Sequence, residues 1–298
     1  MIPNNNLSVL PFYTSLDGQN AKKWWIYGRT YPLYTPAGYL PPFQLILPHY
    51  SGTFALNYLW LYRITERGGH VLVGVYTDEI MNAGIARKQF SSLGYDVIVF
   101  GGQTPVWTDL QNGRYFLAIS VKGTGISQRY YSEVFTVVND MEPYLKLTWW
   151  DADDFVMDAG TIVYKYSNGT QFKNVLYFPS DLAKPEYTFE EEGETRDGYF
   201  FPTKQISEKR YRFNFLAPEY LLDVMRFIRM ADFAEIEYHG QTYSLDTFLM
   251  TPTWEDEGDI AVVEAEFETA TVAKKIGTGY IKSLRGDFND DFNVDFDI

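Results

Sequence analysis

The sequence predicts a mainly β protein made of two antiparallel, sandwich-like domains. Aromatic residues make up 18% of the 298 residues, in short runs separated by Gly, Asn-Gly and Pro, as is typical of pleated strands. Two cores of roughly 150 residues are commoner than one at this length. The charge also changes: residues 1–138 carry 7 acidic and 10 basic side chains, and residues 139–298 carry 32 and 15. We therefore expect domains over 1–142 and 143–284, with a hinge around 140–144, and an extended tail over 285–298.

The first domain is predicted to hold seven short strands, each β-branched or aromatic and bounded by turn residues. These strands are expected over 24–27, 43–47, 58–62, 71–75, 96–100, 115–119 and 132–137. Gly68-Gly69 and Asn112-Gly113 suit the positive φ angles of tight hairpin turns. About seven strands with turns at this spacing favour an immunoglobulin-like or fibronectin-like sandwich.

The second domain is predicted to continue with strands, by the same criteria. These strands are expected over 145–150, 162–166, 172–177, 211–215, 235–238, 241–244 and 260–268. The turn-forming residues 167–170 give the clearest hairpin signal in the chain, joining 162–166 to 172–177. Period-2 alternation puts Glu264, Glu266 and Glu268 on one face of the last strand.

One segment of the second domain has the period of a helix instead. Leu221, Val224, Met225 and Ile228 follow i, i+3, i+4, i+7 spacing, with Pro218 at the expected first helical position. We predict one amphipathic helix, about 218–231, whose apolar face packs against a sheet.

Composition excludes several kinds of site and partner. The chain has no Cys, which excludes disulfides, thiolate metal sites and a Cys nucleophile. The first residues do not form a signal peptide, and no stretch approaches about 18 apolar residues, so we expect a soluble, unexported protein with no membrane partner. A pI near 4.7 disfavours binding to phosphate backbones, so no nucleic-acid partner is expected.

Motif searches give no catalytic signature. His49, His70 and His239 lie far apart and are each expected to be a partly exposed turn or strand-end residue. There is no HExxH, GxSxG, GxxxxGK[ST] or GxGxxG pattern. We therefore predict no enzyme, no cofactor and no metal.

Two acidic clusters lie beside tryptophans. We expect them to be solvated loops, with two functional alternatives. Residues 151–154 follow Trp149-Trp150, and residues 255–259 follow Trp254. Carboxylates beside Trp suit a glycosidase pair or a sugar platform. The run 190–194, Glu-Glu-Glu-Gly-Glu, is expected to be a loop.

The C-terminal tail carries the most specific local pattern. Residues from Asp287 alternate between polar and apolar, and only Asp290 interrupts the apolar face. That face holds Phe288, Phe292, Val294, Phe296 and Ile298. We favour strand addition to an exposed sheet edge of a neighbouring subunit. A frayed terminus and a calcium loop are the alternatives, although Phe292 and Ile298 stand where an EF-hand loop has its Gly and its bidentate Glu. The tripeptide 285–287, Arg-Gly-Asp, is not expected to act in cell adhesion.

Two stretches carry a family resemblance. Residues 113–119 leading to 130–135, and residues 267–277, resemble uncharacterised structural proteins encoded by phages and prophages of Bacteroidetes bacteria, loosely over 95–280. The resemblance implies a virion component of the tail, baseplate or neck, built from β-sandwich modules and assembled in the host cytoplasm. It supplies no catalytic residues.

We therefore expect a non-enzymatic protein that forms a homo-oligomeric ring through β edges, oppositely charged domains and the tail. Its expected partners are copies of itself and neighbouring virion proteins. The alternative is a carbohydrate-binding or receptor-binding sandwich module that contacts a glycan through exposed Tyr and Trp.

Overall fold

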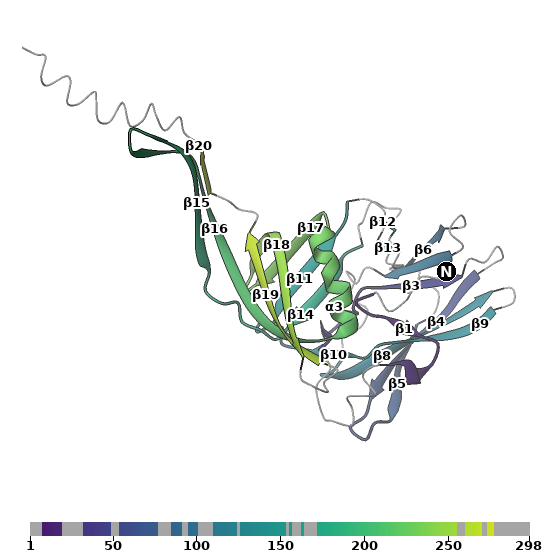
Figure 1. Cartoon of the computed structure of the whole chain (residues 1–298). Helices are drawn as coiled ribbons and strands as arrows, with labels where there is room; N and C mark the ends of the chain where they lie inside the picture. The colour runs from purple at the N-terminus through teal and green to yellow at the C-terminus, as the bar shows by residue number, and fades with distance from the viewer. Residues whose placement is uncertain are drawn as a thin grey trace, which may run out of the picture.

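A computed structural model shows a mainly β chain with one α-helix among the described residues (Figure 1). The structure describes residues 8–19, 32–48, 54–76, 85–90, 95–100, 110–123, 126–152, 155–156, 162–163, 172–254, 260–269 and 273–276.

The first half of the chain builds two sheets from ten strands and one 3-10 turn. These elements are β1 (Phe12–Tyr13), η2 (Leu16–Gly18), β2 (Tyr34–Pro36), β3 (Phe43–Pro48), β4 (Phe54–Ile64), β5 (His70–Tyr76), β6 (Ile85–Phe90), β7 (Tyr95–Phe100), β8 (Gly113–Gly123), β9 (Ile126–Ser132) and β10 (Phe135–Val138). In the first sheet β8 is central: β4 and then β5 extend one side, while β9 and β10 share the other and carry β1 and β2. The second sheet has the order β3-β7-β6.

Apolar side chains of both sheets bury one another. Phe43 of β3 lies with its ring centroid 5.0 Å from Phe12 of β1 and 5.5 Å from Phe100 of β7. Leu59, Leu61 and other residues of the first sheet belong to the same buried cluster. The first half therefore has a sandwich-like arrangement, as its alternating sequence predicts.

The second half builds one large sheet and a small strand pair. Its elements are β11 (Leu145–Trp150), β12 (Phe155–Val156), β13 (Ile162–Val163), β14 (Asn174–Phe178), β15 (Glu186–Arg196), β16 (Tyr199–Pro218), α3 (Glu219–Met225), η4 (Arg226–Met230), β17 (Phe233–Tyr238), β18 (Gln241–Trp254), β19 (Ile260–Thr269) and β20 (Ala273–Ile276). The large sheet has the order β14-β11-β17-β18-β19-β16-β15, with β20 beside the first part of β16.

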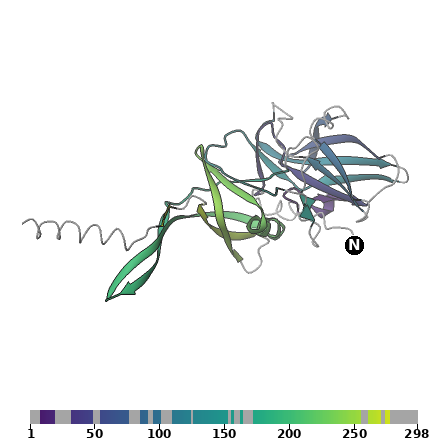
Figure 2. The ribbon, with the colours of Figure 1, turned by 90° about the horizontal axis from the view of Figure 1, so that it is seen from above.

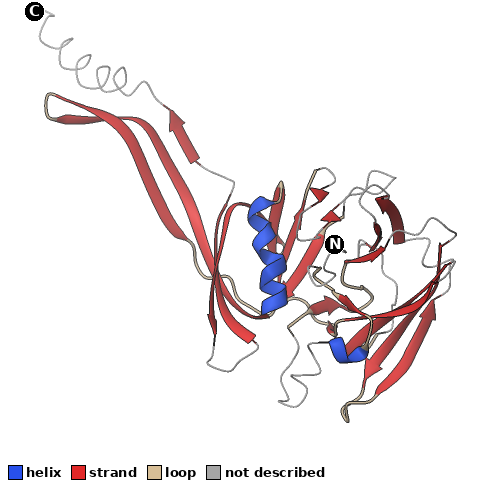
Figure 3. Cartoon of the chain, turned by 45° about the vertical axis from the view of Figure 1, so that its right-hand side comes forward, coloured by secondary structure: helices blue, strands red, loops and turns tan. Residues whose placement is uncertain are grey.

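The predicted helix is confirmed. It runs through α3 and η4, so it ends within a residue of the expected boundary, with Pro218 as its N-cap. All four residues of the predicted stripe, Leu221, Val224, Met225 and Ile228, are buried. Figure 3 shows the helix lying against the large sheet.

The two halves share their interior. The buried cluster continues from the first sandwich into the large sheet and the helix. At this junction the hydroxyl of Tyr13 donates a hydrogen bond to Glu133 Oε2 at 3.0 Å, while the backbone amide of Val134 donates to Glu133 Oε1 at 2.9 Å. Burial, followed by the nearby Glu133 and Tyr220 of α3, raises the pKa of Tyr13 well above its usual value. The buried Glu133 side chain is therefore held by hydrogen bonds from β1 and from the segment that precedes β10.

Three sequence predictions need correction. The strand expected over 132–137 is interrupted between β9 and β10. There the side chain of Ser132 accepts a hydrogen bond from the backbone amide of Leu117, and the side chain of Glu133 accepts one from the backbone amide of Val134. Gly113 begins β8 and does not adopt a positive φ, so Asn112-Gly113 is no tight hairpin turn, whereas Gly68 does adopt one (φ 82°).

The third correction concerns strand pairing in the second half. Among the described residues, β14 pairs with β11 and not with β13; Leu147 lies opposite Leu176 and Leu145 opposite Phe178, all buried. β13 pairs with β12. The predicted turn 167–170 and the predicted strand 24–27 lie outside the described residues.

Candidate assembly surfaces

A long β-hairpin projects from the large sheet, and we call residues 186–209 the arm. β15 pairs with residues 199–210 of β16 around a turn in which Asp197 (φ 52°) and Gly198 (φ 86°) both have positive φ. β20 pairs with residues 204–207, so the tip, 193–203, is a two-stranded ribbon among the described residues. Figures 1 and 2 show the arm leaving the body of the protein.

The arm exposes large aromatic side chains. The exposed fractions are 69% for Tyr187, 64% for Phe189, 72% for Tyr199 and 50% for Phe200. Cross-strand register puts Tyr187, Phe189 and Phe200 on one face of the ribbon. An isolated two-stranded hairpin is marginally stable in water, and exposed aromatic residues gain nothing from folding it.

Ion pairs hold the base of the arm. Arg212 Nε lies 2.8 Å from Glu266 Oε2, and Arg210 Nη2 lies 2.8 Å from Glu268 Oε1. Arg212 also reaches Glu186 of β15, at 3.3 Å. The predicted shared face of Glu264, Glu266 and Glu268 is therefore confirmed, and it faces guanidinium groups of β16 across the sheet.

The arm corrects the expectation that residues 190–194 form a loop. They lie within β15, where Glu191 Oε1 accepts from Gln205 and Glu192 pairs with Lys204 at 2.8 Å. Two signals in the sequence pointed to this hairpin: the alternation of Tyr187 and Phe189, and the dipeptide Asp197-Gly198.

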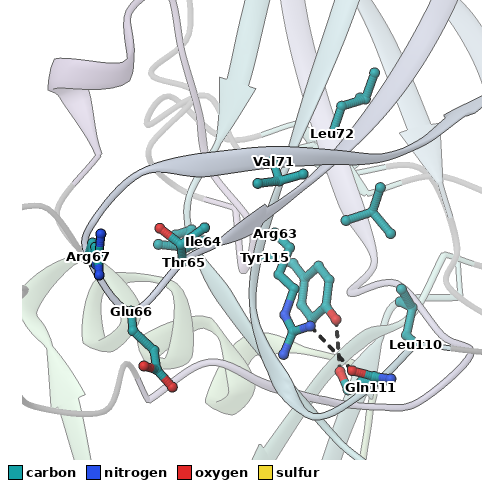
Figure 4. A pocket seen from close by; sticks show the side chains of 11 residues that line it. Arg63, Ile64, Thr65, Glu66, Arg67, Val71, Leu72, Leu110, Gln111 and Tyr115 are labelled. Atoms are coloured by element: carbon teal, nitrogen blue, oxygen red, sulfur yellow. Dashed lines mark hydrogen bonds between the residues drawn. The ribbon is translucent and has the colours of Figure 1, made fainter.

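A second exposed surface lies beside β5 of the first sheet. A cavity of about 870 Å³, the edge pocket, opens beside the β4–β5 hairpin and is shown in Figure 4. β5 lines it with Val71, Leu72 and Val73, which are 56%, 47% and 48% exposed. Ile64, Leu110 and Tyr115 complete the apolar lining. Among the described strands, β5 pairs with β4 alone.

Arginines line the same pocket. Arg63 donates to Gln111 Oε1 and to the carbonyl oxygen of Asn112, both at 3.3 Å, and the hydroxyl of Tyr115 donates to the carbonyl oxygen of Gln111 at 2.8 Å. Arg67 and Glu66 stand at the hairpin turn. Both of these acceptors of Arg63 are uncharged, and the carboxyl group of Glu66 lines the same pocket.

A polar groove of about 520 Å³ lies between the halves of the chain. Tyr39 from the first half faces Tyr177, Lys146 and Glu237 of the large sheet, with Lys146 Nζ 3.0 Å from Glu237 Oε2. Burial, and after it Glu237 and Tyr39, raises the pKa of Tyr177 to about 12. Tyrosine rings beside carboxylate and ammonium groups suit a polar ligand such as a sugar.

The tryptophans beside the two acidic clusters lie in different surroundings. Trp149 and Trp150 are buried, and Trp150 stacks on Phe233 while Lys173 Nζ lies 3.7 Å from its ring centroid. Asp151 accepts from the backbone amide of Asp232, which closes the end of the β11–β17 pair. Trp254 lies at the opposite end of β18, ten residues beyond the last β17–β18 pair, on the order of 30 Å along the strand. Residues 153–154 and 255–259 lie outside the described residues.

The other candidate residues are partly placed. His70 begins β5, its ring 5.3 Å from that of Tyr62, and His239 occupies a turn with φ 47°, so both lie at a turn or strand end as predicted. His49 and the tail residues Phe288, Phe292, Val294, Phe296 and Ile298 lie outside the described residues. The described ranges hold no group of three or more acidic or His side chains that is placed to bind a metal. Within those same ranges, no helix has both the length and the apolar character needed to cross a membrane.

Comparison with known proteins gives no relative: no protein-family model matches the chain, and no curated protein matches it significantly.

Proposed function

We propose that this chain is a non-enzymatic structural protein that assembles with copies of itself, as a component of a virion tail, baseplate or neck. The observation that carries the assembly role is the arm, with four exposed aromatic side chains on a ribbon that has no core of its own. Interfaces are enriched in such aromatic residues. The virion setting rests on the resemblance of residues 113–119, 130–135 and 267–277 to phage structural proteins, and with it we class the first half as immunoglobulin-like or fibronectin-like.

Charge supports the same proposal. Residues 186–209 carry seven acidic and three basic side chains, whereas the first half of the chain is mildly basic. Copies that stack head to tail bring an acidic surface to a basic one, which favours correct encounter. The C-terminal tail, with its alternating Asp and Phe, adds a second segment suited to pairing with a neighbour.

Removing the arm tip tests the proposal. Deleting residues 193–203 and joining Glu192 to Lys204 by Asn-Gly closes the ribbon between two paired residues with a favoured turn. We expect light scattering, over a concentration and salt series, to show a discrete oligomer for the full chain and at least tenfold weaker association for the shortened chain. A chain truncated after Arg285 measures the contribution of the tail. A full chain that remains monomeric at high concentration and low salt would refute the assembly role.

The polar groove favours a second candidate function, a glycan-binding or receptor-binding module. Tyr39 and Tyr177 flank charged groups there, as in sites that bind sugars. Under this alternative, polysaccharide perturbs the Tyr and Trp fluorescence of a monomeric protein, and Tyr39→Ala abolishes the change.

A further inference from the structure

We propose that the arm tip of one copy docks in the edge pocket of the next copy, so that the subunits join head to tail. This inference rests on the proposed assembly function and names the surface that receives the arm.

The edge pocket needs a cover. Val71, Leu72 and Val73 are consecutive in β5 and all line the pocket, because a bulge in the β4–β5 register leaves Val73 without an opposite residue. All three are about half exposed, on an edge strand that contains no Asp, Glu, Lys or Arg. Natural proteins protect apolar edges with charges or cover them, since open edges aggregate.

The arm tip matches the pocket in chemistry. Tyr199 and Phe200 are exposed aromatic anchors of the kind that dominate binding energy when they fill an apolar pocket. Glu194 and Asp197 lie beside them in the ribbon, and both are exposed. Arg63 and Arg67 of the pocket supply the opposite charge. A complementary charge pair at the rim fixes the orientation of docking.

The contact extends along the strands. Two aromatic side chains bury roughly 300–500 Å², which is less than the roughly 800 Å² per partner of a stable interface. The tip ribbon has two open edges among the described residues, and β5 has one. Backbone pairing between a ribbon edge and β5 supplies the remaining contact, as in strand addition.

The occupant is a second copy and not the chain's own arm. The arm and β5 lie at opposite ends of the protein in Figure 1. β16 continues from the arm into the large sheet, where residues 210–218 pair with β19, and the arm extends from this anchored base away from β5 in Figure 1. A donor and an acceptor at opposite ends give a heterologous contact, which forms a ring if the rotation closes.

A complementation experiment tests this contact. Val73→Glu blocks the pocket with a negative charge, which repels the acidic arm tip, while keeping the arm; the shortened-arm chain described above keeps the pocket. We expect each variant alone to associate at least tenfold more weakly than the full chain. We expect their equimolar mixture to form a dimer of one copy of each, measured by mass photometry with one variant carrying a fused tag of known mass. The dimer cannot grow, because each partner lacks one of the two surfaces.

Val262→Glu is the matched control, since Val262 is also 48% exposed but lies on β19 of the large sheet. It should assemble like the full chain, and loss of assembly in both Glu variants would overturn the proposed specificity for the pocket. If the shortened arm abolishes assembly while Val73→Glu does not, the arm function stands and this acceptor is wrong. If the mixed dimer fails to form, the arm is not the occupant. The same holds if association requires residues 286–298 but not the arm. Circular dichroism melts establish that each variant is folded.

Discussion

The two parts of β16 use the same kinds of residue in opposite surroundings. From Tyr211 to Ala217, alternate side chains are buried beneath α3, and the rings of Phe213 and Phe215 lie 5.6 Å apart. From Tyr199 to Lys209 the same strand forms the arm, where Tyr199 and Phe200 face solvent. Aromatic side chains in the first setting stabilise the fold, whereas those in the second gain free energy only when a partner covers them. The difference separates residues needed for folding from residues that we propose serve assembly.

The largest expected effect compares one phenylalanine from each part. Phe213→Ala should lower the free energy of unfolding by about 3–5 kcal/mol, because Phe213 is 2% exposed and its loss leaves a cavity. Phe189→Ala on the arm should change it by about 0.5 kcal/mol or less. Urea denaturation of dilute protein, where association is absent, measures both. Equal losses would mean that the arm has a packed interior and would remove the distinction between the two parts.

The pH dependence of stability compares one tyrosine of the large sheet, Tyr177, with one of the arm, Tyr187. Burial first, then Glu237 and Tyr39, raise the pKa of Tyr177 to about 12, so the unfolded chain loses this proton near pH 10 while the folded chain keeps it. Stability is therefore fully present below pH 10 and is lost as the pH rises from 10 to 12, by up to about 2 kcal/mol. Tyr177→Phe should remove that part of the alkaline loss in urea titrations at several pH values. Tyr187→Phe, on the exposed arm, should leave the loss as it is, and an identical effect of both changes would contradict the assigned cause.

The smallest expected effect compares two ion pairs. Arg212 contacts Glu266 at 2.8 Å and Glu186 at 3.3 Å within a network, while Lys204 contacts Glu192 at 2.8 Å as an exposed pair on the arm. Arg212→Gln should lower the stability more than Lys204→Gln does, because Arg212 contacts two carboxylates and Lys204 contacts one. The cost of Arg212→Gln should shrink in high salt, because ions screen surface charges. Thermal melts at low and high salt measure both, and a larger loss for Lys204→Gln would reverse the expected order.

Much of the fold follows from local sequence pattern. The helix was predictable because Leu221, Val224, Met225 and Ile228 repeat with a helical period, and all four are buried. Strand pairing was harder to predict. The run 172–177 has strong β character, but its partner β11 was selected by buried contacts such as Leu147 opposite Leu176. Such pairing depends on which apolar surfaces meet, and a turn signal in the sequence does not contain that information.

The candidate surfaces were only partly predictable. The Asp197-Gly198 turn signals a hairpin, yet the run of glutamates at 190–192 has low β propensity and favours a loop by composition. Cross-strand partners such as Lys204 and Gln205 offset that preference. The edge pocket carried no signal at all, since Val71, Leu72 and Val73 look like any buried strand. Their exposure depends on the absence of a further strand beside β5 among the described residues, which is a property of topology.

The contact between Tyr13 and Glu133 also has a consequence for folding while the chain is being synthesised. β1 pairs with β9, and the Tyr13–Glu133 hydrogen bond spans 120 residues of chain. At a ribosomal rate of 5–20 residues per second, the segment around Val9, Leu10 and Phe12 waits roughly 6–24 s for its partner to emerge. During that interval side chains that end in the core are exposed to the cell, so the nascent N-terminal segment is where a chaperone has the longest opportunity to bind.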